Sequence, residues 1–450
     1  MVKFKLKQSQ AIFLSGQSGL VFVGAALSHF VDFNALDTHF PKSNGIKLSD
    51  VLRSYVGLLA TGKSDFDAIE SRREDEFFAR ALDVSQVPSS ASLRQRLDEV
   101  AEPLKALVDE APVALLRRAK AAISPLASGH VPVDIDVFPM DNSASCKEGV
   151  SRTYAGFDGY APIAGYVGEE GWCVGLELRP GSQHSAKDAP AFVGRVLSRA
   201  AQLTPAPLLL RMDSGFDGAE IILSAAQQAI ERLKHGGRDI AILIKANPRS
   251  LDVVSLYAAK CIDAASAWLT AREGKRFTIW EHVVVRRFGA KETSLRRIYR
   301  LTERTIVKGQ ALLVPELEVD VWETSLQAPV EEVIALYCQH GTHEQFHSEI
   351  KSDLDLERLP SGKFATNALI LSLGALTYNI LRLMGQQALL GPDAPIRHRA
   401  KRRRIKTVMQ ELIYLAAKLT RQAGRWVLDF GRHCPAFAVF ERTYRCWSAS

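Results

Sequence analysis

Val131-Pro-Val-Asp134-Ile-Asp136-Val-Phe138 is the stretch on which the fold of this 450-residue sequence depends. Apolar residues alternate in it with Asp134 and Asp136, which is the period of a β-strand. The chain before it shows the three- and four-residue apolar spacing of helices, so the secondary structure changes here. Both aspartates lie on one face of the predicted strand. Two carboxylates on one face of an apolar strand indicate a functional role.

The elements that follow this strand predict a mixed sheet. A hairpin of two strands comes first, then helix, strand, helix and strand, at residues 161–168, 172–179, 186–203, 208–213, 218–234 and 239–245. The order β-β-β-α-β-α-β is that of the ribonuclease-H-like fold. The active site of that fold gathers carboxylates from the first strand, the end of the fourth strand and a late helix. Asp136, Asp213 and Glu344 occupy those three places.

We therefore predict a multi-domain α/β protein with a ribonuclease-H-like catalytic core and helical regions at both ends. The predicted parts are a helical N-terminal DNA-binding region (1–125), the first part of the core (126–250), a β-rich insertion (251–328), the final part of the core (329–390) and a basic helical C-terminal region (391–450). The apolar run 365–384 contains Asn367, Asn379 and Arg382. We interpret it as a buried helix rather than a membrane span.

Composition supports a globular protein with a polyanionic partner. The sequence is 47% hydrophobic and 24% charged, which is ordinary for a soluble domain and excludes general disorder. Lys and Arg number 57 against 50 Asp and Glu, a net charge of +7 that mildly favours a polyanion. The six cysteines form no C-x-x-C pair, so we expect a reducing cytoplasm, neither disulfides nor a cysteine zinc site, and no membrane association.

A second stretch, Tyr337-Cys-Gln-His340-Gly-Thr-His-Glu344-Gln-Phe-His347-Ser-Glu-Ile-Lys351, carries the late-helix chemistry. Its spacing would place Tyr337, His340, Glu344, His347 and Lys351 on one face of a continuous helix. One carboxylate among donors and cations suits a metal ligand whose neighbours bind phosphates.

Gly341 interrupts this stretch. A glycine inside a helix costs about 1 kcal/mol relative to alanine, which favours a restart of the helix there. Thr342 and Gln345 have the spacing of a capping box for the new helix. Glu344 would then lie in a first turn, where the helix dipole favours negative charge.

The same residues support an alternative, a zinc metallopeptidase. His343-Glu344-Gln-Phe-His347 fits H-E-x-x-H, in which two histidines one turn apart bind zinc and the glutamate activates water. Glu357 is the only plausible third ligand, and its spacing is poor. This alternative leaves Asp136 and Asp213 without a role.

The chain resembles bacterial insertion-sequence transposases of the DDE group, in the cut-and-paste branch with a β-strand insertion before the final glutamate. The resemblance covers nearly the whole length. It is carried by Asp136-Val-Phe-Pro-Met-Asp141-Asn-Ser143, Lys147 to Tyr154, Phe157 to Pro162, Arg211-Met-Asp213-Ser-Gly-Phe216, and a Tyr-Arg-Glu-Lys-type signature at Tyr337, His340, Glu344 and Lys351. His340 stands where the family usually has arginine, so it would be a weaker and pH-dependent phosphate contact.

The resemblance implies cleavage at transposon ends and strand transfer into target DNA. Asp136, Asp213 and Glu344 would hold two Mg²⁺ ions roughly 3.5–4 Å apart, with Mn²⁺ as a substitute. Asp134 remains an alternative first acidic residue because it points the same way as Asp136. Converging carboxylates repel one another, so at least one of them should have a raised pKa in the metal-free protein.

The expected partner is double-stranded DNA, in both transposon ends and target. Tyr337, His340 and Lys351 would position the phosphate at the transposon end, and Trp280 or Trp322 would either stack on an extruded base or pack in the core. Further contacts are expected, against the alternative of solvated surface, from the arginines of two basic segments, namely Arg94, Arg96, Arg402, Arg403 and Arg404.

The resemblance also implies a homodimer that joins two DNA ends, in the bacterial cytoplasm and associated with DNA. A catalytically inactive, transposase-derived DNA-binding protein is a third hypothesis. The presence of all three acidic residues argues against it.

Overall fold

The strand predicted at residues 131–138 forms β2 (Val131–Val137) inside a nine-stranded sheet. The computed structural model describes residues 8, 12–41, 45–248 and 250–448. The order of this sheet is β10-β11-β12-β13-β9-β8-β2-β6-β7. Strands β6 and β7 continue antiparallel from β2, whereas β8 and β9 run parallel to it. The order of elements predicted from the sequence is confirmed for this half of the sheet.

The strands have the following bounds: β1 Phe13–Ser15, β3 Met140–Asp141, β4 Ser151–Arg152, β5 Asp158–Tyr160, β6 Ile163–Val167, β7 Trp172–Glu177, β8 Leu208–Met212, β9 Ile240–Ala246, β10 Leu269–Arg272, β11 Lys275–Phe288, β12 Lys291–Val307, β13 Gln310–Thr324, β14 Ala417–Gln422 and β15 Arg425–Phe430. The helices have these bounds: α1 Leu20–His29, α2 Asn34–His39, α3 Leu48–Ala60, α4 Glu76–Ala81, α5 Ser90–Arg118, α6 Ala189–Leu203, α7 Ala219–Lys234, α8 Val253–Ile262, α9 Val330–Cys338, α10 His343–Ser348, α11 Phe364–Ala388, α12 Ile405–Val408 and α13 Phe437–Ser448.

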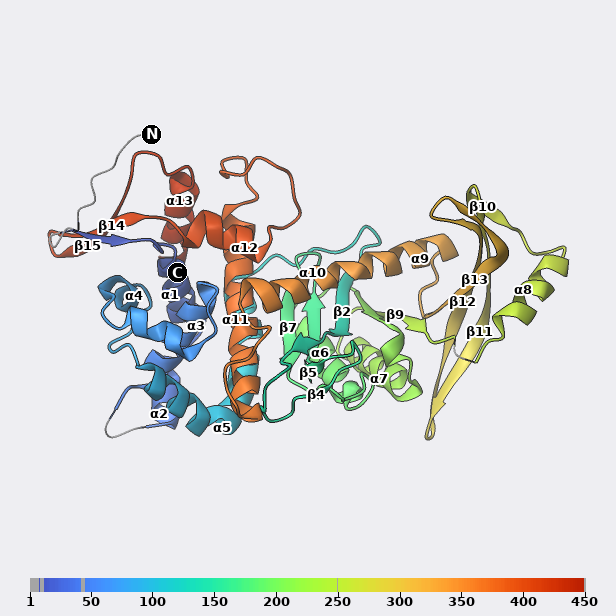
Figure 1. Ribbon diagram of the computed structural model, residues 1–450, viewed down its shortest axis with the longest axis horizontal. Coiled ribbons are helices and arrows are strands. Elements are labelled where there is room, and N and C mark those ends of the chain that lie inside the picture. Colours follow the sequence, from blue (N-terminus) through green and yellow to red (C-terminus); the bar gives the residue numbers. More distant parts are fainter. Residues whose placement is uncertain (1–7, 9–11, 42–44, 249, 449–450) are drawn as a thin grey trace.

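The insertion extends the central sheet. Strand β13 pairs antiparallel with β9, so the long strands β11, β12 and β13 continue the hydrogen-bonded ladder at the end of the molecule opposite the terminal helices (Figure 1). Ion pairs link the three strands at this junction, because the buried Asp320 carboxylate on β13 pairs with Lys245 of β9 at 3.0 Å and with Arg300 of β12 at 2.6 Å. Helix α8 is an additional element that the sequence pattern did not indicate.

Helix α11 is the buried helix predicted at residues 365–384. It is long and apolar enough to cross a membrane, but its apolar window is entirely buried inside the protein. Its covering comes from β7 on one side and from α3 and α5 of the N-terminal region on another (Figure 1). Polar contacts fix the register, since Thr366 donates to Asp98 at 2.6 Å and Ser372 to Asp109 at 2.5 Å. The N-terminal helices therefore share one hydrophobic core with the sheet.

The prediction of a helical C-terminal region was incomplete. Strands β14 and β15 form a hairpin there, and β1 from the N-terminal region pairs with β14. The turn consists of Ala423 and Gly424, which both have positive φ angles, of 47° and 80°. Two such residues match the right-handed twist of a two-residue hairpin.

Candidate active site

The late-helix stretch forms an almost continuous helical rod next to the sheet (Figure 1). Helix α9 passes through a 3-10 turn at Gln339–Thr342 into α10, so the α-helix is interrupted near Gly341, as predicted, although the chain remains helical there. The predicted capping box is wrong. Thr342 has helical angles and makes no capping bond, and its hydroxyl donates to the Gln339 carbonyl at 3.0 Å instead. The backbone thus tightens without breaking, and the side chains on both sides of the turn still face β2.

Asp134 is held in a closed ion pair inside the protein. Its carboxylate accepts from Nε and Nη2 of Arg211 at 2.7 and 2.8 Å and contacts Nδ1 of His340 at 2.9 Å. Burial alone would raise the pKa of Asp134, but the charges of Arg211 and His340 outweigh it and hold the pKa well below its usual range. Both carboxylate oxygens are therefore occupied by protein donors.

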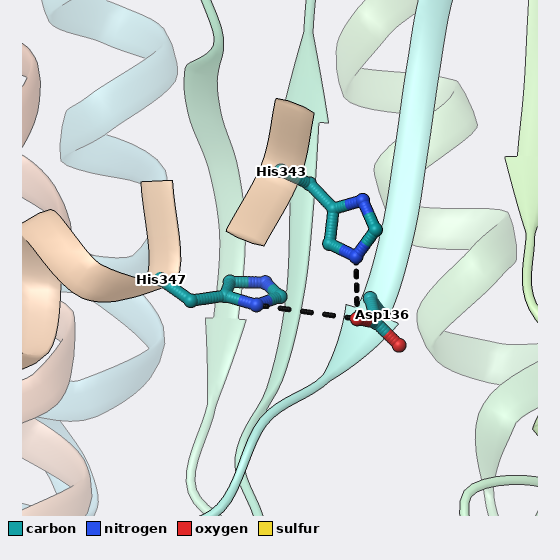
Figure 2. A group of neighbouring side chains, drawn as sticks. All are labelled: Asp136, His343 and His347. Atoms are coloured by element: carbon teal, nitrogen blue, oxygen red, sulfur yellow. Dashed lines mark hydrogen bonds and ion pairs between the residues drawn. The ribbon is translucent and has the colours of Figure 1, made fainter. Parts of the chain in front are cut away.

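Asp136, two residues further along β2, faces the cavity beside α10. Its Oδ2 lies 2.6 Å from Nε2 of His343 and 4.0 Å from Nδ1 of His347 (Figure 2). Burial works against the charge on Asp136, yet the hydrogen bond from His343 and the nearby His347 lower its pKa. For His343 the same hydrogen bond overcomes burial and raises the pKa. Of the two strand aspartates, Asp136 is the more exposed, and it is the one that lines the cavity beside Glu344 and Lys351.

A cavity of about 410 Å³ lies in front of Asp136. It is also lined by Tyr154, Glu344, His347 and Lys351. Glu344 is exposed to solvent, and Lys351 donates to the Pro139 carbonyl at 2.9 Å. The fold thus brings the first-strand aspartate, the late-helix glutamate and the lysine of the signature to a single cavity.

Asp213 directly follows the parallel strand β8 and is half-buried. Its Oδ1 accepts a hydrogen bond from the Gly215 amide at 3.0 Å. Burial and, next in size, the negative charge of Asp136 raise the pKa of Asp213. Burial together with these two carboxylates also raises the pKa of Tyr154 to about 12. Asp213 is therefore within electrostatic reach of Asp136, and the predicted upward shift of one carboxyl pKa is present.

The tightest set of potential metal ligands is not the three carboxylates. Among the residues that the structure describes, Asp136, His343 and His347 are the group whose ligand atoms all lie within 4.8 Å of one another. Glu357, the expected third ligand of an H-E-x-x-H site, instead pairs with Lys351 at 3.1 Å and accepts from the Asp141 amide at 2.7 Å. We correct that expectation, because Asp136 is the residue that lies beside the two histidines.

The sequence matches the family described as Transposase DDE domain group 1 over residues 34–447. The chain belongs to this family. Among solved structures, it is similar to a piggyBac transposase seen by cryo-EM in a synaptic complex with hairpin DNA, with 10% sequence identity and a TM-score of 0.39. That similarity covers 96% of this chain and 84% of the other. Comparison with curated proteins finds no match.

In this DDE-family protein, two of the three residues expected to position phosphate are turned inward. His340 is only 3% exposed and is bonded to Asp134. Tyr337 is half-buried, with its ring 6.2 Å from Trp322 and 5.7 Å from His340. Lys351 alone of the three lines the cavity. Packing of the rod against the sheet, which sequence spacing does not reveal, accounts for the difference.

The arginines expected to contact DNA also differ from a simple basic surface. Arg96 is 7% exposed and pairs with Glu99 at 2.7 Å, whereas Arg94 is exposed and lies 5.5 Å from the Phe66 ring. Arg403 is 9% exposed, and its guanidinium donates to three backbone carbonyls. We correct the expectation of exposed side chains at Arg96 and Arg403, because both side chains are buried and bonded within the protein.

Arg402 and Arg404 hold the segment that carries Glu344. Arg402 donates to Gln345 at 3.0 Å and lies over the Phe346 ring at 4.7 Å. Arg404 makes a two-pronged contact with Asp353, which ends the π-helical segment after α10. Two residues of the basic run, Arg402 and Arg404, therefore hold α10 and the π-helical segment after it in place.

Glu349 also holds this segment in place. Its side chain is fully buried and pairs with Arg382 of α11. Burial raises the pKa of Glu349 even though Arg382 opposes the shift. Local sequence spacing could not predict this ion pair, because Arg382 belongs to α11, which is separated from Glu349 by a loop.

The two tryptophans differ in exposure. Trp322 is 2% exposed and belongs to the core, as the packing alternative predicted. Trp280 is half-buried between two neighbours, with Tyr299 stacked at 5.0 Å and the ammonium group of Lys260 at 4.6 Å from its ring. The Trp280 ring is thus already in contact with two protein side chains.

Arg211 is the site residue that sequence reasoning missed. A signal was present, because Arg211 stands two residues before Asp213 on the same strand. The parallel register of β2 and β8 then sets Arg211 directly opposite Asp134. A buried cation beside the first of two strand aspartates leaves the second free for other ligands.

Proposed function

We propose that the protein is a DNA transposase that cleaves DNA at transposon ends and transfers the strands into target DNA. The observation that carries the proposal is the cavity shared by Asp136, Glu344 and Lys351 in a chain of the DDE family. The half-sheet order β7-β6-β2-β8-β9, with β6 antiparallel and β8 and β9 parallel to β2, supports a ribonuclease-H-like core.

Three carboxylates would supply the oxygen ligands for two Mg²⁺ ions, with Mn²⁺ as a substitute. Burial and, after it, the negative charge of Asp136 raise the pKa of Asp213, and a bound cation would offset both effects. Bound in this way, the ions would activate the attacking hydroxyl and stabilise the leaving oxygen. Asp136 comes from the central strand, Asp213 from the end of the adjacent parallel strand, and Glu344 from the rod. Asp134 is a poorer candidate for a metal ligand because its carboxylate oxygens are already bonded to Arg211 and His340.

Lys351 is the signature residue best suited to hold a DNA phosphate. It lines the cavity and is paired with the half-buried Glu357 at 3.1 Å. A phosphate oxygen that enters the cavity would compete with Glu357 for this ammonium group. We also propose a homodimer on DNA in the bacterial cytoplasm, since joining two DNA ends requires two active sites.

The test is an excision assay on a plasmid that carries the coding sequence with its own flanking DNA. Purified full-length protein with Mg²⁺ should release the segment, and Glu344→Gln should reduce release at least about 100-fold, because one metal ligand loses its charge. Glu332→Gln is the matched control, since Glu332 lies on the same rod in α9 and is exposed. Unchanged excision in Glu344→Gln would contradict the assigned site.

The same assay addresses the alternatives. A catalytically inactive DNA-binding protein would bind the flanking DNA without releasing it. A zinc metallopeptidase is favoured only by the approach of His343 and His347 to Asp136. It would release no DNA and would digest a denatured protein substrate in a zinc-dependent reaction.

A further inference from the structure

Three histidines on the rod face the two aspartates of β2. The rings of His340 and His343 lie 4.1 Å apart and those of His343 and His347 lie 5.0 Å apart, measured between ring centroids. His340 contacts Asp134, while the other two face Asp136. A site for Mg²⁺ alone needs oxygen ligands and gains nothing from imidazoles.

His343 is oriented in the way that metal-binding histidines are. Its Nδ1 contacts the backbone carbonyl of His340, one turn earlier on the rod. This bond turns Nε2 toward Oδ2 of Asp136, 2.6 Å away (Figure 2). A backbone carbonyl on one ring nitrogen commonly fixes the tautomer of a metal ligand and leaves the other nitrogen for the ion.

His347 is fixed by packing. It is 6% exposed, and Phe138 stacks on its ring with centroids 4.3 Å apart. Its Nδ1 points toward Asp136 at 4.0 Å (Figure 2). His347 is also one of the residues that line the cavity. Ligands bound at 2.0–2.1 Å in a tetrahedral site lie about 3.3 Å from one another. The three atoms, all within 4.8 Å, need only small movements to reach that spacing.

We propose that Asp136, His343 and His347 form a binding site for a transition-metal ion of the zinc class. One carboxylate and two imidazoles are ligands that Zn²⁺ and Co²⁺ accept and that Mg²⁺ does not prefer. The cavity supplies an open fourth position. The ions would share Asp136, so Zn²⁺ at this site competes with Mg²⁺. Binding itself is independent of the proposed function, whereas the effect on DNA cleavage rests on it.

The test uses Zn²⁺ and Co²⁺ alone with the full-length chain. Zinc X-ray absorption at one equivalent should show imidazole ligands, and Co²⁺ should give the intense visible bands of a four- or five-coordinate site. His343→Ala and His347→Ala should each weaken Co²⁺ binding more than about 100-fold, beyond the loss usual for an outer-shell partner. His398→Ala, which removes an exposed histidine far along the sequence, is the control and should bind normally.

Two outcomes would overturn the inference. One is zinc held by oxygen ligands only, a measurement on the unmodified protein that needs no folded variant. The other is unchanged Co²⁺ binding in either histidine variant whose circular dichroism matches the unmodified protein.

Glu344→Gln separates this inference from the proposed function. It should keep the Co²⁺ bands while excision is lost. Zinc binding without any DNA cleavage by the unmodified protein would reject the transposase proposal and retain the metal site. Mg²⁺-dependent cleavage with no imidazole-bound zinc would retain the transposase proposal and reject the zinc-class metal site.

Discussion

Asp134 and Asp136 show how two residues with the same side chain and the same orientation receive different tasks. Both lie on one face of β2, and the two-residue period of a strand does not distinguish their roles. The difference comes from Arg211, which the parallel register of β8 puts opposite Asp134. A sequence motif favoured Asp136, but the physical reason lies in a strand pairing across 77 residues of sequence.

We predict that Asp134→Asn destabilises the protein by about 3–5 kcal/mol at neutral pH, because it leaves the buried Arg211 guanidinium without its counter-charge. The pKa of Asp134 is lowered in the folded state, so the ionised pair stabilises the fold above the ordinary value of 3.8. That contribution is lost as the pH falls through the folded pKa. Urea unfolding at several pH values should therefore show a constant gap above pH 5 that narrows below 3.8.

Asp136→Asn is the control for this experiment. Asp136 is more exposed and faces a cavity, so its replacement should cost less stability than that of Asp134 while removing metal binding. Equal destabilisation by the two substitutions would contradict the division of roles.

At the scale of elements, the rod is positioned from two sides. Arg402, Arg404 and Arg382 hold it from the C-terminal part of the chain, while the hairpin between β6 and β7 supports it from the sheet. Phe346 of α10 rests against Gly171 in that hairpin, with Tyr166 5.0 Å from its ring. The sequence predicted the hairpin and the rod correctly. The sequence could not predict the contact between them, because a glycine in a turn does not indicate which side chain packs against it.

Gly171→Ala should destabilise the protein by about 2–4 kcal/mol. The backbone of Gly171 has φ +73°, and an added Cβ would lie 2.1 Å from Cζ of Phe346. Gly129→Ala is the matched control, with φ +79° and no heavy atom within 4 Å of the added methyl, so it reports the backbone term alone. Denaturant unfolding should show a difference of about 1–3 kcal/mol between the variants. Equal losses would mean that Phe346 moves freely and does not position α10.

At the scale of the whole molecule, the sequence predicted five separate regions, whereas in the structure several of them share one sheet and one hydrophobic core. The mixed sheet, the insertion strands and the buried helix all follow from local periodicity, and all are present. Their assembly does not follow from it. The insertion continues the core sheet through β13 and β9, and strand β1 near the N-terminus pairs with β14 near the C-terminus. Such long-range pairings depend on edges and faces that no local pattern describes.

The last prediction concerns the N-terminal region, which the sequence suggests is a separate DNA-binding part. Helices α3 and α5 cover α11, and Asp98 and Asp109 of α5 accept hydrogen bonds from it. A fragment of residues 120–450 would expose that face of a helix whose side chains are otherwise buried. We therefore expect it to lack a cooperative thermal transition and to bind a hydrophobic dye, unlike the full chain. Cooperative melting of the fragment with Co²⁺ binding retained would instead make the N-terminal helices a dispensable domain, and the shared core would then be a docking surface between two independently folding parts.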